Sequence, residues 1–218
     1  MRTELQIGPM TQVVMYYGEH DIAQALGQVV DTAKLLVSRG DVLFLMVGDG
    51  PDKDRLKTIA RGMPNLQFIP LPDDSKKAAY YDMADVCVVP QKSVHGLKKV
   101  IPTKLFEAMG AGKPVIAASD GITASTLTEA RVALVVPPEN SEKLAYAVLR
   151  LVDNPEKAKM LGQKGQQWLV ENYNFERLGD KYLKLLKRVV ANQPVAAPEK
   201  AETPASEENN TSEPVKHG

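Results

Sequence analysis

Residues 13–47 read VVMYYGEHDIAQALGQVVDTAKLLVSRGDVLFLMV, and this stretch decides the fold. Its two ends, Val13–Tyr17 and Val42–Val47, are apolar throughout, a pattern that predicts strands buried on both faces. Between them, apolar residues recur at helical spacing, and they place on one face Ile22, Leu26, Val29, Val30, Ala33 and Leu36. We therefore predict one helix over Ile22–Ser38 and a right-handed strand–helix–strand unit.

The same alternation continues along the chain. Four more apolar runs predict strands at Leu66–Ile69, Val86–Val89, Val115–Ala118 and Ala133–Val136. Helical patterns lie between and after them, at Asp52–Ala60, Asp74–Met83, Thr103–Met109, Ile122–Ala130, Glu142–Val152 with Ser141 as its cap, Pro155 to Asn172, and Phe175–Ala191. This order predicts an α/β protein with a Rossmann-like, doubly wound parallel sheet of about six strands, followed by C-terminal helices.

The composition changes near Asn192. Residues 193–218 are rich in Pro, Ala, Glu, Ser and Asn and contain no leucine, isoleucine, phenylalanine, tyrosine or tryptophan. Such a segment buries too little apolar surface to offset the entropy of ordering. We predict one Rossmann-like domain over residues 1–192 and a disordered tail over residues 193–218.

Charge and composition exclude several classes of protein. The 218 residues include 27 basic and 27 acidic side chains, and this balance argues against binding to nucleic acid. No apolar run approaches the roughly 20 residues of a membrane span, and the first residues lack the core of a signal peptide, so we predict a cytoplasmic protein. Cys87 is the single cysteine, which excludes an intrachain disulfide and a cysteine metal cluster.

The loops after the strands do not carry the common phosphate-binding motifs. The first strand is followed by GEHDIAQ, which is not the glycine fingerprint G-x-G-x-x-G of dinucleotide-binding domains. A P-loop, G-x-x-x-x-G-K-[ST], is also absent from the sequence. Dehydrogenase and P-loop ATPase functions therefore lose their main support.

Residues 102–117, PTKLFEAMGAGKPVIA, carry the clearest site. Pro102 and Thr103 start a helix, whose free N–H groups attract anions, and Lys104 adds a positive charge beside them. Glu107 lies one turn after Lys104, so both side chains can face one ligand. The pair suits a nucleoside diphosphate, with phosphate at Lys104 and ribose at Glu107. The alternative is an ordinary Lys–Glu pair on a solvated helix face.

Six ordered motifs resemble the retaining glycosyltransferases of family 4, which have the GT-B fold. They cover most of the chain before the tail, and they read VVMYYG (13–18), VGDGP (47–51), NLQFIPLP (65–72), YYDMADVCVVP (80–90), PTKLFEAMGAGKPVIA (102–117) and LVVPPENSEKLAYAV (134–148). The resemblance is strongest to the branch that builds bacterial O-antigen, capsule and exopolysaccharide.

The resemblance implies roles for the matching positions. Glu107 would hold the ribose hydroxyls, while Lys104 would face the diphosphate and the sugar together with the backbone N–H groups of Val100 and Ile101. Gly18 would let the first loop approach the phosphates.

The resemblance also covers two positions near the base, and the sequence departs from the family pattern at two places. The resemblance places the backbone near Pro70 and Leu71 against the base. Many members have a first glutamate eight positions before the second, where this chain has Lys99. Many members also have basic residues in the first loop; here His20 is the local candidate for the phosphate side, with a solvated loop histidine as the alternative.

The resemblance implies transfer of a sugar from a nucleotide donor, UDP-linked, to a glycan or lipid-linked acceptor, without a metal or a cofactor. A GT-B enzyme has two Rossmann-like domains, and RTELQIGPMTQVVMYYG at residues 2–18 resembles the entry into the second one. We therefore expect this chain to be the donor half, without the acceptor-binding half. Two alternatives stay open: a non-catalytic subunit that binds nucleotide-sugar and pairs with a separate acceptor-binding chain, and half of a UDP-sugar 2-epimerase.

Overall fold

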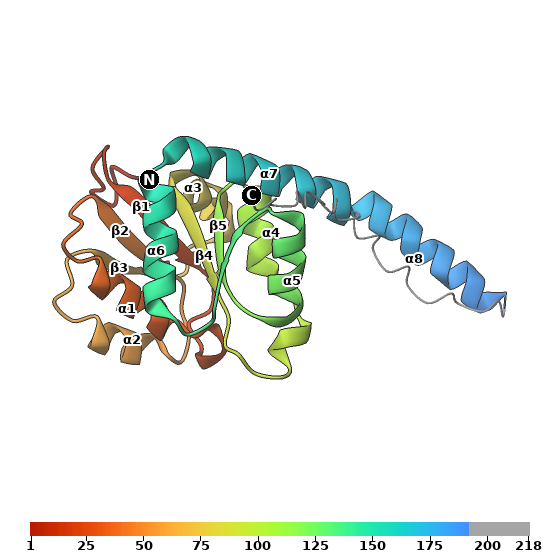
Figure 1. The fold of residues 1–218 in the computed structure, drawn as a ribbon, viewed down its shortest axis with the longest axis horizontal. Helices are drawn as coiled ribbons and strands as arrows, with labels where there is room; N and C mark the ends of the chain where they lie inside the picture. Colours follow the sequence, from red (N-terminus) through yellow and green to blue (C-terminus); the bar gives the residue numbers. More distant parts are fainter. Residues whose placement is uncertain (192–218) are drawn as a thin grey trace, which may run out of the picture. The chain divides into compact units, whose positions relative to one another are not determined.

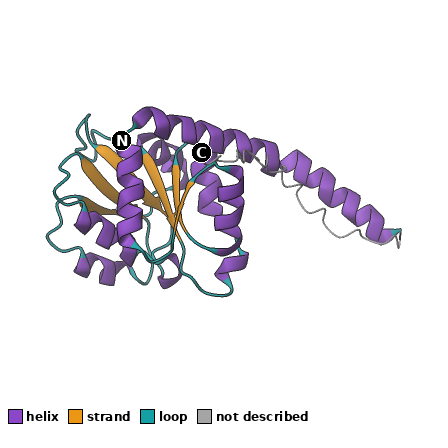
Figure 2. Cartoon of the chain, viewed as in Figure 1, coloured by secondary structure: helices purple, strands orange, loops and turns teal. Residues whose placement is uncertain are grey.

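A computed structural model describes residues 1–191, which divide into a unit from Met1 to Asn174 and a second unit that begins at Phe175. The first unit contains one sheet of six parallel strands in the order β3-β2-β1-β4-β5-β6 (Figures 1 and 2). The strands are β1 (Gln12–Tyr17), β2 (Val42–Val47), β3 (Leu66–Ile69), β4 (Val86–Pro90), β5 (Val115–Ala118) and β6 (Leu134–Val136). The predicted doubly wound α/β sheet is confirmed. The predicted tail, residues 193–218, lies outside the described residues.

Helices cover both faces of this sheet (Figure 1). Successive side chains of β1 point to opposite faces, so Val14 and Tyr16 join one buried cluster while Val13, Met15 and Tyr17 join the other. The first cluster is covered by α1 (Gly27–Leu35), α2 (Lys53–Ile59) and α6 (Ser141–Val152). The second is covered by α3 (Lys77–Met83), α4 (Thr103–Gly110), α5 (Gly121–Ala130) and α7 (Pro155–Tyr173).

The helix predicted over Ile22–Ser38 is wrong at its start. A 3₁₀ turn, η1 (Ile22–Gln24), comes first, and α1 begins only at Gly27. Ala25 between them has a φ of 49°, a left-handed conformation that ends the turn. As a result Ile22, predicted to be buried, is 67% exposed. The predicted cap of α6 is also wrong, since Asn140 rather than Ser141 accepts the hydrogen bond from the N–H of Lys143.

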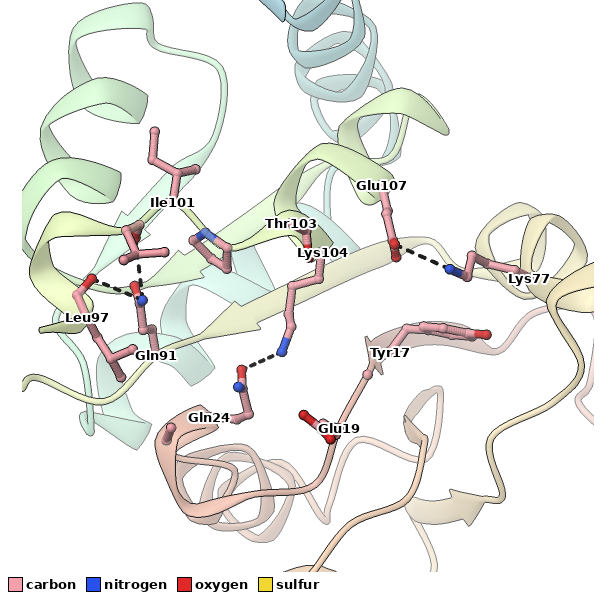
Figure 3. A pocket seen from close by; sticks show the side chains of 14 residues that line it. Tyr17, Glu19, Gln24, Lys77, Gln91, Leu97, Ile101, Thr103, Lys104 and Glu107 are labelled. Atoms are coloured by element: carbon pink, nitrogen blue, oxygen red, sulfur yellow. Dashed lines mark hydrogen bonds and ion pairs between the residues drawn. The ribbon is translucent and has the colours of Figure 1, made fainter.

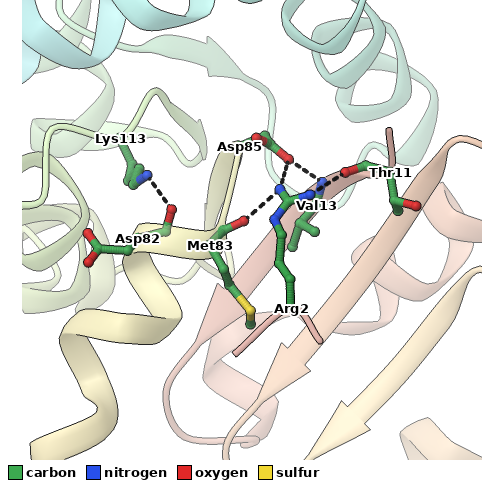
Figure 4. A network of polar contacts seen from close by, with 7 residues as sticks. All are labelled: Arg2, Thr11, Val13, Asp82, Met83, Asp85 and Lys113. Carbon is green, nitrogen blue, oxygen red and sulfur yellow. Dashed lines mark hydrogen bonds and ion pairs between the residues drawn. The ribbon is translucent and has the colours of Figure 1, made fainter. Parts of the chain in front are cut away.

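A network at the amino ends of the strands ties the first residues to the sheet (Figure 4). The guanidinium of Arg2 donates to the Asp85 carboxylate at 2.7 Å and to the backbone carbonyls of Thr11 and Met83, each at 2.9 Å. Asp85 also accepts a bond from the N–H of Val13 at 2.7 Å. One carboxylate thus joins the N-terminal segment to β1.

Two residues of the first unit, Gly162 and Cys87, lie in closely packed surroundings. Gly162 of α7 packs so tightly that a Cβ added there would lie 2.1 Å from the carbonyl oxygen of Gly112. Cys87 lies inside β4 and is 3% exposed, and burial raises the pKa of its thiol to about 12.

The second unit is described only by α8 (Phe175–Val190). This helix is amphipathic, with apolar side chains at Phe175, Leu178, Tyr182, Leu185, Leu186 and Val189. Among residues 1–191, no helix combines the length and the hydrophobicity that crossing a bilayer requires.

Candidate nucleotide site

A pocket of about 480 Å³ opens where β1 and β4 end (Figure 3). β1 and β4 are neighbours in the sheet. The chain adds β2 and β3 on the side of β1, and β5 and β6 on the side of β4. Ligands of doubly wound sheets bind at this point, outside the carboxyl ends of the strands. The lining comes from the end of β1, from η1, from the loop between β4 and α4, and from the first turns of α3 and α4.

The start of α4 supplies free backbone donors to this pocket. Ile101, Thr103 and Lys104 all line it, and their N–H groups donate no bond to any residue that the structure describes. Pro102, which lies between them, has no N–H to offer. The predicted donor Val100 lines the pocket, but its N–H is already bonded to the carbonyl of Leu97 at 3.1 Å. The η3 turn (Leu97–Lys99) uses this donor, so the expectation that the Val100 N–H faces a ligand is wrong in this structure.

Lys104 reaches across the pocket toward the end of β1. Its ammonium donates to the hydroxyl of Tyr16 at 3.0 Å and to the side-chain oxygen of Gln24. Burial lowers the pKa of Lys104 to about 8, and the carboxylates of Asp21 and Glu19 limit this decrease. The lysine is therefore a cation at neutral pH whose charge is easily removed in mild alkali.

Glu107 lies one turn further along α4 and faces the same pocket (Figure 3). One carboxylate oxygen is 3.3 Å from the ammonium of Lys77, and the other accepts a bond from the hydroxyl of Tyr81 at 3.1 Å. Burial opposes the shift, but the bond to Glu107 raises the pKa of Lys77 above its ordinary value. Both carboxylate oxygens of Glu107 therefore have hydrogen-bond partners.

Glycines bring the first loop close to Lys104. Gly18 has a φ of 145°, and a Cβ there would lie 3.3 Å from Cε of Lys104. Gly48, after β2, approaches even more closely, since its Cβ would lie 1.8 Å from the carbonyl oxygen of Gly18. A side chain at Gly48 would therefore displace the wall of the pocket. In the sequence, the glycines of the motif VGDGP indicate this close approach of the two loops.

His20 does not lie in the pocket, and the prediction that it faces the phosphates is wrong in this structure. Its side chain is fully buried, with the rings of Tyr16 and Phe68 as neighbours. Neither ring nitrogen has a hydrogen-bond partner within residues 1–191. Burial lowers the pKa of His20 to about 4, Lys53 acts in the same direction, and Asp49 opposes both.

The positions predicted near the base are also outside the pocket. Pro70 and Leu71 follow β3, which is the edge strand and is separated from β1 by β2. Lys77, the first residue of α3, lines the pocket instead. Sequence analysis missed Lys77 and Gln24, because no local motif marks a side chain whose partner lies on a different helix.

A sequence profile of the family described as "Glycosyl transferases group 1" matches residues 1–188. The chain belongs to this glycosyltransferase family. It is 25% identical over 186 residues to a GDP-mannose-dependent monoacylated alpha-(1-6)-phosphatidylinositol monomannoside mannosyltransferase of Corynebacterium glutamicum, covering 81% of this chain and 45% of the relative. It is 27% identical over 191 residues to the 2-deoxystreptamine glucosyltransferase of Streptomyces kanamyceticus, covering 86% and 46%. The chain thus spans less than half the length of these curated relatives.

Solved structures agree with this fold. Sucrose-phosphate synthase from Thermosynechococcus elongatus superposes with a TM-score of 0.73 at 25% identity, over 88% of this chain and 49% of the other. Anabaena HepE in complex with UDP superposes with a TM-score of 0.71 at 17% identity, over 85% and 51%.

Proposed function

We propose that the pocket between β1 and β4 binds a nucleotide-sugar, UDP-linked, and that this chain forms the donor half of a retaining glycosyltransferase. The acceptor would be a glycan or a lipid-linked sugar in cytoplasmic polysaccharide biosynthesis. One observation carries the proposal: Lys104 and Glu107, on consecutive turns of α4, face one pocket beside three free backbone N–H groups.

Each part of a nucleoside diphosphate has a matching group in this pocket. The phosphates would lie against the ammonium of Lys104 and the N–H groups of Ile101 and Thr103, where the dipole of α4 favours negative charge. The ribose hydroxyls would replace Lys77 and Tyr81 at the two oxygens of Glu107. We propose no metal and no cofactor, because the cation and the helix start would stabilise the departing diphosphate.

The identity of the base is tested by titrating the chain with UDP, GDP and ADP in a calorimeter. HepE is solved in complex with UDP, which supports UDP, whereas the corynebacterial relative is GDP-mannose-dependent. We expect the tightest binding for UDP. Tighter binding of GDP would support the same nucleotide site but indicate a GDP-linked donor.

The assigned roles predict different losses for two variants. Glu107→Ala removes a charge-assisted pair of hydrogen bonds to the ribose, so it should weaken UDP and uridine alike, by about ten- to a hundredfold. Lys104→Ala should weaken UDP more than uridine, since uridine has no phosphate. Unchanged UDP affinity in the Glu107 variant would remove the ribose role, and equal losses of both ligands in the Lys104 variant would remove the phosphate role.

Acceptor-dependent turnover separates the enzymatic proposal from its rivals. Because the chain spans less than half of its relatives, we propose that the 218-residue chain binds donor without transferring sugar. A radiolabelled donor and a lipid-linked acceptor test this, with and without a separately expressed acceptor-binding domain. Transfer only in the mixture would support a split transferase. The family match favours transfer over the 2-epimerase alternative. Release of a sugar epimerised at C2 would support that alternative instead.

A further inference from the structure

A second pocket, of about 350 Å³, lies on the other side of the η1 segment from the donor pocket. Ala23 and Gln24 line the donor pocket, while Ile22 and Ala25 line the second one, so one short segment forms a wall of both. The remaining walls come from the first turns of α1 and α2, from the residues after β4, and from the loop between β6 and α6.

The lining of this second pocket contains unmet hydrogen-bonding capacity. Gln28 lines it and is only 6% exposed, yet neither its amide oxygen nor its amide nitrogen has a partner among the described residues. An amide left without partners in a buried place costs free energy unless water or a ligand satisfies it. Asp52, 5% exposed, also lines this pocket and accepts two bonds from Arg55, at 2.6 and 2.7 Å.

The pocket is lined by charges of both signs, the carboxylates of Asp31, Asp52 and Glu139 and the cations of Arg55 and Lys92. Asp52 and Arg55 neutralise each other, and the remaining two carboxylates and one ammonium favour a neutral ligand over an anion. An apolar ligand would leave the amide of Gln28 unsatisfied. A ligand with many neutral hydroxyl groups can donate to the carboxylates and accept from the ammonium, the guanidinium and the amide. The exposed side chain of Ile22 offers an apolar surface beside these polar groups.

We propose that this second pocket binds a neutral saccharide, independently of the nucleotide assigned to the first pocket. The polar groups would bind the hydroxyls, and Ile22 would pack against the carbon-bound hydrogens of the ring. Its volume falls at the lower end of the range for small-molecule sites.

The test is a titration of ¹⁵N-labelled full chain, followed by NMR, with N-acetylglucosamine, glucose and mannose as probes. Glucosamine and glucose 6-phosphate are the cationic and anionic comparisons. We expect saturable shifts of the Gln28 side-chain amide and the Gly27 N–H with at least one neutral sugar, with or without UDP. The absence of saturable shifts for all three, or tighter binding of a charged sugar, would overturn the proposal.

Variants separate this pocket from the donor site. Gln28→Met keeps the size of the side chain and should lower saccharide affinity about tenfold while leaving UDP affinity unchanged. Gln167→Met, on the exposed surface of α7, is the matched control and should bind sugar normally. Asp31→Ala, also exposed, serves as a second test that does not disturb the interior. Unchanged sugar binding in both pocket variants would refute the site, whereas loss of UDP binding in Glu107→Ala bears only on the donor pocket.

Discussion

Lys104 is the residue on which the charge of the donor pocket depends. Because its pKa is about 8 in the free protein and only the ammonium attracts phosphate, UDP affinity should fall as the pH rises through 8. Calorimetry between pH 6.5 and pH 10 measures this fall. Lys104→Arg is the control, since arginine stays charged and its affinity should not follow that curve. A flat profile in the wild type would mean that Lys104 does not contact the phosphates.

His20 makes the stability of the fold sensitive to acid. Its pKa is about 4 in the folded protein and about 6.5 in the unfolded chain, so the folded state favours the neutral ring. The stabilisation is complete above pH 6.5 and is lost as the pH falls toward 4, up to about 3 kcal/mol. In urea unfolding at pH 7 and pH 4.5, His20→Leu should lose less stability than the wild type. Equal losses in the two proteins would show that other groups dominate.

The contact between α7 and the turn after α4 reverses the usual effect of an alanine. In the middle of a helix, glycine to alanine stabilises by about 1 kcal/mol. At Gly162, however, the new methyl group would clash with the carbonyl of Gly112, so we expect Gly162→Ala to destabilise by about 1–3 kcal/mol. Gly179→Ala in α8 is the control: its methyl group has open space, and helicity by circular dichroism should rise. A more stable Gly162 variant would show that α7 packs less closely than the structure has it.

The elements of the sheet were predictable because their pattern is simple. Three strands, Val42–Val47, Leu66–Ile69 and Val115–Ala118, have the predicted bounds, since continuous apolar runs end where the chain leaves the core. The pattern failed at Ile22, where helical spacing continued across Ala25 although the backbone turns there. Periodicity records which positions are apolar, and a single left-handed residue does not alter it.

At the scale of the whole molecule, UDP should stabilise the first unit as a single body. The proposed site takes residues from both halves of the sheet, so a ligand at about 100 times its Kd should add about 2.7 kcal/mol to the free energy of unfolding. Hydrogen exchange should slow about a hundredfold at the most protected amides of β1 and β4. The amides of α8, which contributes no residue to the pocket, should exchange as before. Protection confined to the half that contains β4 would contradict the proposed site.

The candidate site was predictable only in part, because the sequence does not show which residues of different elements come together in space. The stretch 102–117 located Lys104 and Glu107 in one pocket, because both lie on one face of a short helix. The partners Lys77 and Gln24 come from other elements, and their approach depends on the strand order. His20 follows Gly18 in a loop, yet the turn after β2 covers it, and nothing in the local sequence indicates this burial.

The single cysteine has a practical consequence. Because only the thiolate attacks alkylating reagents, Cys87, sealed inside β4 with its high pKa, should stay unlabelled while the sheet is closed. Each labelled molecule then records one opening event of the central strands. The rate at which Cys87 becomes labelled therefore measures the rate of opening without any engineered probe. Mass spectrometry can follow this labelling in a crude lysate as well as in a purified sample.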